Sequence, residues 1–265
     1  MNINPASIWN DLDTIRKNAP LVHNITNYVV MNNTANALLS LGASPVMAHA
    51  EPEVADMVNI ASALVINIGT LSDPWINAMF KAAARAKERN IPIILDPVGA
   101  GATKYRTNTV MEMLKTTPPT IIRGNGSEIM ALCKEDTNTK GVDSTDASDT
   151  AVNSAKIINN GFGSVVCITG KIDYIVSKNN ILKVKNGHAM MPKVTGLGCT
   201  ASALCGAFAA VNSEYDMAAA HAMAIMGIAG EIAAKNSAGP ASLQLNFIDA
   251  LYQLTYDNIK DYFKE

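Results

Sequence analysis

Short apolar runs rich in β-branched residues alternate along this chain with longer stretches of helical periodicity, and this alternation limits the possible folds more than any other feature. The apolar runs are typical of buried strands, and they occupy residues 20–25, 44–48, 63–68, 91–95, 120–122 and 165–169. The stretches between them carry apolar residues three and four positions apart, and they occupy residues 30–41, 53–62, 74–89, 107–115, 127–134 and 150–159. Strands and helices in this serial order predict a parallel sheet.

Two parallel architectures compete at this length. An eightfold α/β barrel takes about 250 residues, and the chain has 265. Residues 173–177 and 181–185 argue against the barrel, because the short segment between them leaves room for a hairpin turn and none for a crossover helix. The rest of the chain is almost wholly helical, over residues 200–211, 217–235 and 243–263. We therefore expect an open three-layer α/β/α sandwich with a mainly parallel central sheet.

One polar run, residues 134–148, interrupts the apolar periodicity, which resumes on both sides of it. We interpret this run as a surface loop and expect a single domain over residues 1–265. Residues 217–230 form the most apolar stretch, which is shorter than the ~20 residues of a membrane span. A buried helix, with no membrane contact, is the expected structure there.

The composition excludes several classes of protein. Apolar residues make up 48% of the chain and charged residues 17%, which indicates a globular core rather than a disordered tail. Lys and Arg number 21 against 23 Asp and Glu, so no basic surplus indicates a nucleic-acid partner. The four cysteines form no CxxC motif or paired framework, which favours reduced thiols and the cytoplasm.

The strongest local signal is the segment VTGLGC at residues 194–199, followed by a run of small residues. Gly196 and Gly198 let the backbone pass close to a ligand, and the free amides of a helix N-terminus would form an anion hole there. The helix dipole would also lower the pKa of the Cys199 thiol, which makes Cys199 a candidate base or nucleophile. An ordinary glycine-rich turn with a buried cysteine explains the segment equally well.

Polar residues also follow three apolar runs, at the points where parallel strands gather ligands. Asp96 opens a Pro/Gly loop and suits a metal ion, although an aspartate there can also cap the loop. Arg123 suits a nucleotide phosphate, and Thr169 places a hydroxyl at another strand end. Glu128, in the first turn of an expected helix, is either a metal carboxylate or an acid that the helix dipole favours. The phosphate-loop pattern GxxxxGK[ST] is absent from the sequence.

Taken together, the motifs resemble one family, the hydroxyethylthiazole kinases of the ribokinase-like fold. The match rests on many motifs in order over nearly the whole chain, namely HNITN, SPVMAHAEPE, LDPVGAGA, IRGNGSEI, GVDSTD, ITGK and VTGLGC. The resemblance implies ATP-dependent phosphorylation of the hydroxyl group of 4-methyl-5-(2-hydroxyethyl)thiazole in thiamine biosynthesis or salvage. It also implies Mg²⁺, and a homotrimer whose sites lie between subunits.

The resemblance further assigns roles to single residues. Cys199 would be the catalytic base, although most ribokinase-like enzymes outside this family carry Asp at that place. The remaining residues would contact thiazole (Met47, Gly196 and Asn24), ATP (Arg123, Thr169 and Gly198) and magnesium (Asp96 and Glu128).

Three other functions compete with this one. The first is a pyrimidine or pyridoxal kinase of the same fold, which substrate competition would separate. The second is a nucleotide or vitamin sensor that binds without turnover. The third is a thiol hydrolase in which Cys199 forms a covalent intermediate without ATP.

Overall fold

The computed structural model describes residues 3–136 and 147–264 of the chain, and its strands form one eight-stranded sheet. The strands are β1 (Leu21–Ile25), β2 (Ser44–Val46), β3 (Ala63–Asn67), β4 (Ile93–Asp96), β5 (Ile121–Asn125), β6 (Val165–Thr169), β7 (Asp173–Val176) and β8 (Ile181–Val184). Their order in the sheet is β2-β1-β3-β4-β5-β6-β7-β8. Strands β1 to β6 pair in parallel, whereas β7 and β8 continue the sheet as an antiparallel hairpin.

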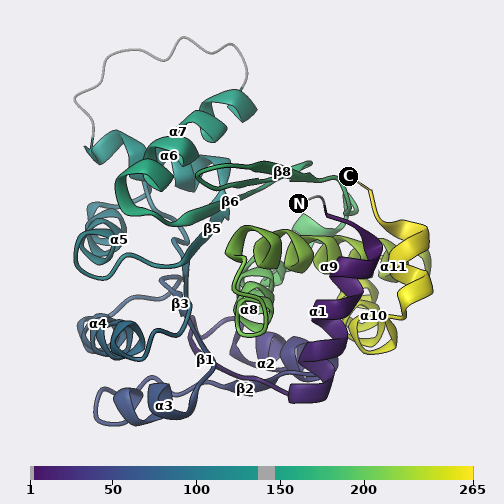
Figure 1. Ribbon diagram of the computed structural model, residues 1–265, viewed down its shortest axis with the longest axis horizontal. Coiled ribbons are helices and arrows are strands. Elements are labelled where there is room, and N and C mark those ends of the chain that lie inside the picture. Colours follow the sequence, from purple (N-terminus) through teal and green to yellow (C-terminus); the bar gives the residue numbers. More distant parts are fainter. Residues whose placement is uncertain (1–2, 137–146, 265) are drawn as a thin grey trace.

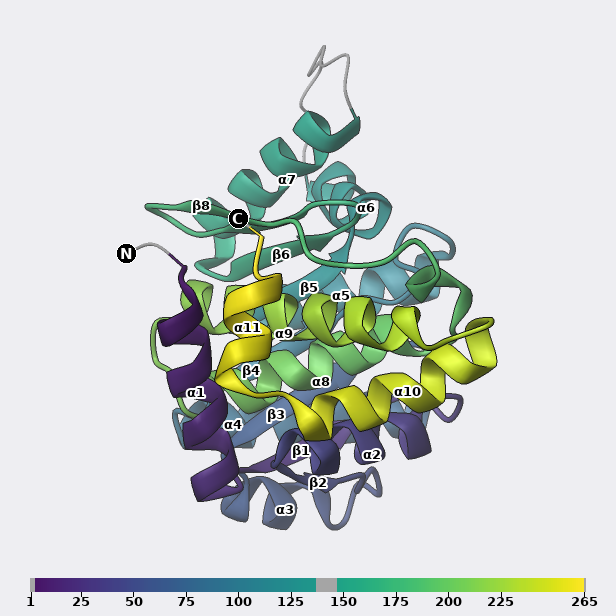
Figure 2. The ribbon, with the colours of Figure 1, turned by 90° about the vertical axis from the view of Figure 1, so that its right-hand side faces the viewer.

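Helices cover both faces of this sheet (Figure 1). One layer contains α3 (Val54–Ile60), α4 (Asp73–Glu88), α5 (Lys104–Thr116), α6 (Gly126–Asp136) and α7 (Ala147–Phe162). The opposite layer contains α1 (Pro5–Asn18), α2 (Met31–Leu41), α8 (Leu197–Ala209), α9 (Tyr215–Lys235), α10 (Pro240–Gln253) and α11 (Tyr256–Tyr262), with the short 3₁₀ helix η1 (Met191–Lys193) before α8. Figure 2 shows α10 and α11 on the outside of the opposite layer, over α9. The expected three-layer α/β/α sandwich is confirmed.

The sheet separates two hydrophobic cores because successive side chains of a strand point to opposite faces. In β3, Leu64 and Ile66 pack against the layer of α4, whereas Val65 between them packs against α8. All three are buried. Strands of this kind are covered on both sides, which explains why they read as continuous apolar runs rather than as alternating ones.

Several element boundaries differ from those expected. Strand β2 ends at Val46, so Met47 lies in the loop that follows, whereas β5 extends to Asn125 and contains Arg123. The single C-terminal helix expected over residues 243–263 is two helices, α10 and α11. Most of the expected surface loop at residues 134–148 lies outside the described residues, and the two ends of this loop belong to α6 and α7. The GVDSTD motif at 141–146 lies wholly outside the described residues.

Helix α1 was not expected, although its sequence carries the signals for it. Ile8, Leu12 and Ile15 are spaced four and three residues apart and are fully buried. The Asn4 side chain caps the helix by accepting from the Ser7 backbone, and Pro5 follows the cap. These features are typical of a helix start in front of an amphipathic face.

Helix α9 is longer than the apolar stretch read from the sequence. It spans 21 residues, and within the described residues it is the one helix long and apolar enough to cross a membrane. Its most apolar window is 83% buried inside the protein, between α8, α10 and the sheet. The helix expected over residues 217–235 therefore begins two residues earlier, at Tyr215, and its expected burial is confirmed.

Candidate active site

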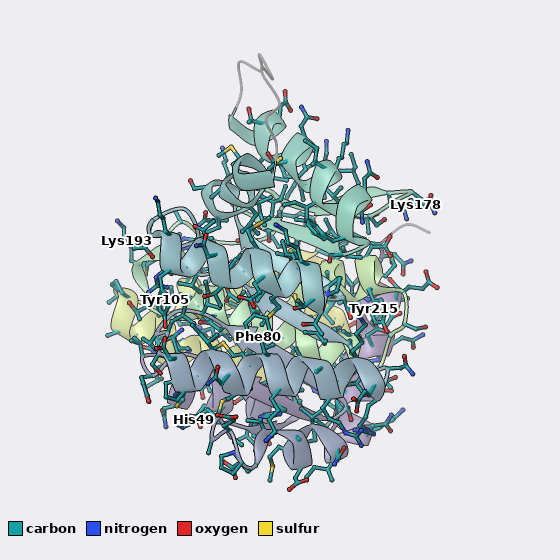
Figure 3. All side chains as sticks on the ribbon, turned by 90° about the vertical axis from the view of Figure 1, so that its left-hand side faces the viewer. His49, Phe80, Tyr105, Lys178, Lys193 and Tyr215 are labelled. Atoms are coloured by element: carbon teal, nitrogen blue, oxygen red, sulfur yellow. The ribbon has the colours of Figure 1, made fainter. Side chains whose placement is uncertain are left out.

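Polar side chains gather where the parallel strands end. Asn67, Asp96 and Thr169 are the last residues of β3, β4 and β6, and Asn27 follows β1 by two positions. The first turns of α8 face the same edge, as the contacts below show. In Figure 3, His49, Tyr105 and Lys193 mark this end of the molecule, whereas Lys178 and Tyr215 lie at the opposite end. Ligands of open α/β sheets bind at the carboxyl ends of the strands.

The N-terminus of α8 is shaped by Gly196 and Gly198. Gly196 is the N-cap residue with φ of 91°, a conformation that favours glycine, and an added Cβ would lie 2.8 Å from Cγ1 of Val30. At Gly198 an added Cβ would lie 3.1 Å from Nη1 of Arg123. The absence of both side chains lets the loop after β1 and the guanidinium approach the amides of the first helical turn, which have no partners within the helix.

Cys199 lies in this first turn and is half-buried. Its Sγ accepts a hydrogen bond from Asn27 Nδ2 at 3.4 Å. Burial raises the pKa of the Cys199 thiol to about 11, and the nearby Asp96 carboxylate adds to the increase, while Arg123 and the two asparagines act against it. The pKa of the thiol is therefore raised, and the expected lowering at the helix N-terminus was wrong, because burial and the Asp96 charge both disfavour the thiolate.

Asp96 is buried at the end of β4. Its Oδ2 accepts hydrogen bonds from Asn67 Nδ2 and Ser202 Oγ, each at 2.8 Å. Burial raises the pKa of its carboxyl group to about 6, although Arg123 and the two donors act against the increase. With this pKa the carboxyl group is still mostly ionised at pH 7, so a negative charge at the centre of the strand edge is available to an incoming cation.

The Glu128 carboxylate accepts hydrogen bonds from two backbone N–H groups of the site. Its Oε1 accepts from Gly99 N at 3.0 Å and its Oε2 from Asn125 N at 2.8 Å, while Asn125 Oδ1 caps the helix by accepting from Glu128 N at 2.9 Å. Glu128 thus joins the loop after β4 to the start of α6. No group of three or more His, Cys, Asp or Glu side chains suited to a metal ion occurs in residues 3–136 and 147–264.

Arg123 and Thr169 lie on adjacent strands and contact each other. Arg123 Nη2 donates to Thr169 Oγ1 at 2.5 Å, and Thr169 Oγ1 in turn lies 3.3 Å from the Gly124 carbonyl oxygen. The Nε of Arg123 is buried without a hydrogen-bond partner. A buried donor left unpaired is costly, so it is a suitable contact for an anionic ligand.

Two residues expected to contact a substrate lie away from these contacts. Asn24 is buried within β1, where its Nδ2 donates to the Val22 carbonyl oxygen at 2.9 Å. Met47 is half-buried in the loop after β2, two residues before His49, whose ring packs on Trp75. The roles of both residues stay predictions.

Three residues of the site were not predicted from the sequence, namely Asn27, Asn67 and Ser202. Asn27 contacts Cys199, Asn67 and Ser202 contact Asp96, and Asn27 and Asn67 contact each other. Asn67 carried a usable signal, because it is a polar residue at the end of an apolar run, as Asp96 is. Asn27 lies in the HNITN segment, in which the family resemblance assigns a role to Asn24. Ser202 carried no signal, since it lies among small residues within a helix.

Comparison with known proteins identifies the family of this chain. The profile described as "Hydroxyethylthiazole kinase family" matches residues 12–257. This chain belongs to the hydroxyethylthiazole kinase family. The hydroxyethylthiazole kinase of Syntrophus aciditrophicus (strain SB) is 62% identical over 260 residues, which is 98% of this chain and 96% of the relative. That of Leptospira biflexa serovar Patoc is 56% identical over 94% of each chain.

Solved structures support the same family and fold. The hydroxyethylthiazole kinase of Pyrococcus horikoshii OT3 superposes with a TM-score of 0.91 at 43% identity, covering 97% of each chain. A ribokinase-like superfamily protein from Enterococcus faecalis V583 superposes with a TM-score of 0.70 at 13% identity, covering 98% of this chain and 95% of its own. The second comparison shows the fold alone. The chain is thus a kinase of the ribokinase-like fold, and kinases of this family use ATP as co-substrate.

Proposed function

We propose that this kinase transfers the γ-phosphoryl group of ATP to the hydroxyl group of 4-methyl-5-(2-hydroxyethyl)thiazole, in thiamine biosynthesis or salvage. The match of the family profile to residues 12–257 carries the proposal. The site agrees with it, because a thiol, an arginine and an open helix N-terminus meet at one strand edge. Phosphoryl transfer depends mainly on positioning and charge neutralisation, and these groups supply both.

Each group takes a role that its surroundings support. Arg123 and Thr169 bind the nucleotide, and the backbone at Gly198 lets the phosphates approach the guanidinium and the free amides of α8. Gly196 forms the floor of the thiazole site, to which Met47 and Asn24 also contribute. Cys199 accepts the proton of the substrate alcohol. Its sulfur lies in the first helical turn, beside the amides that would stabilise the transferring phosphoryl group.

The donors at the strand edge fit a magnesium ion held with the phosphates. Both hydrogen bonds to Asp96 from the described residues reach Oδ2, which leaves Oδ1 for a ligand. Mg²⁺ is usually held by one or two carboxylates together with water and substrate phosphates, so a larger acidic cluster is not needed. Asp96 and Glu128 would hold the ion, which when bound neutralises the charge of the phosphates.

The proposed active form is a homotrimer with each thiazole site between two subunits. The sequence also suggested that the segment from Asn24 to Met47 faces Gly196 of a neighbour, but Val30 of this segment lies against Gly196 of its own subunit, so a neighbouring subunit would complete the site from outside this contact. Exposed apolar side chains on this side support an interface. Tyr28 and Val29 are exposed directly after Asn27, and Leu39 and Leu245 line a hollow of about 430 Å³ between α2 and α10. Light scattering of the active enzyme tests the assembly, and a fully active monomer at assay concentration would refute it.

The substrate is tested by ADP release with three alcohols: the thiazole alcohol, hydroxymethylpyrimidine and pyridoxal. We expect turnover with the thiazole alcohol and a much lower kcat/KM with the other two. Binding of ATP and thiazole without turnover would indicate a sensor, and an acyl adduct formed without ATP would indicate a thiol hydrolase. Cys167, Cys199 and Cys205 are free thiols, which supports a reducing compartment such as the cytoplasm.

A further inference from the structure

Two asparagine side chains connect the Cys199 thiol to the Asp96 carboxylate. Asn27 Nδ2 donates to Cys199 Sγ at 3.4 Å and to Asn67 Oδ1 at 2.9 Å. Asn67 Nδ2 donates in turn to Asp96 Oδ2 at 2.8 Å. Both asparagines are almost fully buried, so neither amide exchanges these partners for bulk water.

Backbone groups determine which way each amide faces. The N–H of Val29 donates to Asn27 Oδ1 at 3.1 Å, and the N–H of Gly69 donates to Asn67 Oδ1 at 2.9 Å. A backbone N–H has no acceptor capacity, so each Oδ1 must face it and each Nδ2 must point the other way. The amide orientations therefore follow from the network itself. The Asn27 group that faces Cys199 is a donor.

A donor facing the sulfur fixes the chemistry of the thiol. The sulfur acts as acceptor toward Asn27, so the proton of the neutral thiol cannot point at that amide and is directed elsewhere. When the thiol loses its proton, the same N–H stabilises the thiolate, because hydrogen bonds to a charged group are stronger than those to a neutral one.

We propose that Asn27 and Asn67 are positioning residues of the phosphoryl transfer, which orient the Cys199 sulfur as a proton acceptor and stabilise its thiolate. The proposal rests on the proposed role of Cys199 as the base. Asn27 donates to the sulfur at 3.4 Å, and both amides act to lower the pKa of the thiol. Asn67 also holds the Asn27 amide between the sulfur and the backbone. The anchor at the other end of the pair is Asp96, and the loops after β1 and β3 supply the orienting N–H groups.

Gly69 provides a second, independent sign of the same arrangement. An added Cβ there would lie 2.7 Å from Asn27 Nδ2 and 2.9 Å from two carbon atoms of the same side chain. Contacts that short force the Asn27 amide to move. Glycine at this position thus leaves the space in which Asn27 reaches the sulfur.

Two charged groups also act on the thiol, and the test must separate them from the amides. The Asp96 carboxylate on β4 raises the pKa of the Cys199 thiol and the Arg123 guanidinium on β5 lowers it. Neither contacts Asn27 by a hydrogen bond in residues 3–136 and 147–264, so an uncharged change at Asn27 leaves both charges in place.

The experiment measures how fast iodoacetamide alkylates Cys199 as a function of pH, with peptide mass spectrometry to distinguish it from the three buried cysteines. The variants are Asn27→Leu, which keeps the size and removes the donor, and Gly69→Ala, which keeps Asn27 and crowds it. Asn160→Ala, at an exposed position on α7, is the matched control. Because the lost bond reaches a charged group, the thiolate population should fall about tenfold to 100-fold.

We expect the alkylation midpoint to move upward by about one pH unit or more in both variants and to stay unchanged in the control. With the thiazole alcohol, kcat should fall by the same factor while the KM for ATP stays within about twofold. Unchanged alkylation profiles in folded Asn27→Leu and Gly69→Ala would overturn the proposal. The alkylation readout needs no substrate, so a failure of the proposed function, seen as absent thiazole turnover in the parent enzyme, is distinguishable from a failure of this inference.

Discussion

The exchange of Cys199 for Asp offers the sharpest test of how the proton leaves the substrate. With a thiol pKa of about 11, about one molecule in 10⁴ carries a thiolate at pH 7, and this fraction rises about tenfold with each pH unit. If the thiolate is the base, kcat of the parent enzyme should rise about 1,000-fold between pH 7 and 10. An aspartate has an ordinary pKa near ~3.9 and is ionised much earlier, even after an increase caused by burial and Asp96.

We therefore expect Cys199→Asp to keep substantial activity and to reach its maximal kcat at a lower pH than the parent. Cys199→Ala should lose about 10²-fold or more of kcat, as is usual when a general base is removed. Neither substitution should greatly change the KM for ATP. The assay is steady-state ADP release at saturating ATP and thiazole alcohol from pH 6 to 10, with nucleotide binding and thermal unfolding measured on each variant.

Two results would refute the reasoning. A parent kcat that is independent of pH over this range would show that the thiolate population does not limit the reaction. A folded Cys199→Asp variant that binds ATP but is inactive, together with a covalent adduct trapped on the parent enzyme, would show that Cys199 acts as a nucleophile.

Three further predictions concern the rest of the site. The carboxyl group of Asp96 has a pKa of about 6 in the folded protein, which is above its value in the unfolded chain. The free energy of unfolding therefore falls as pH rises from about 4 to 6 and is lower by about 3 kcal/mol at pH 7. Asp96→Asn should abolish turnover yet melt at a higher temperature than the parent at pH 7.5, and a lower melting temperature would contradict this. Arg123→Ala should mainly raise the KM for ATP. Arg123→Lys should have a raised KM as well, because Lys lacks the planar guanidinium that contacts Thr169. An unchanged KM in Arg123→Ala would show that Arg123 has only a structural role. Gly196→Ala should lower the free energy of unfolding by about 1–2 kcal/mol because of the left-handed backbone, and by more because the added Cβ would lie 2.8 Å from Val30. We expect a lower melting temperature together with a lower kcat. An unchanged melting temperature and kcat would show that the N-terminus of α8 tolerates the side chain.

The sequence by itself determined the architecture, because strand and helix patterns are local. The continuous apolar runs at residues 63–68 and 165–169 match β3 and β6 closely, since strands buried on both faces need apolar side chains at every position. The hairpin at residues 173–185 was equally readable from its short turn. The ends of the elements were less readable, as at β5, because polar residues such as Arg123 extend a strand only when a neighbouring strand pairs with them.

Only the tertiary structure decided which side chains meet at the strand edge. The sequence indicated Asp96 and Cys199 separately, more than 100 positions apart, but not the amides of Asn27 and Asn67 that connect them. The pKa of Cys199 shows the physical reason. A helix N-terminus is visible in the sequence and suggests a lowered pKa, whereas burial and the charge of Asp96 depend on packing between distant segments and raise it. Local pattern specifies elements, and electrostatics depends on what the folded chain brings together.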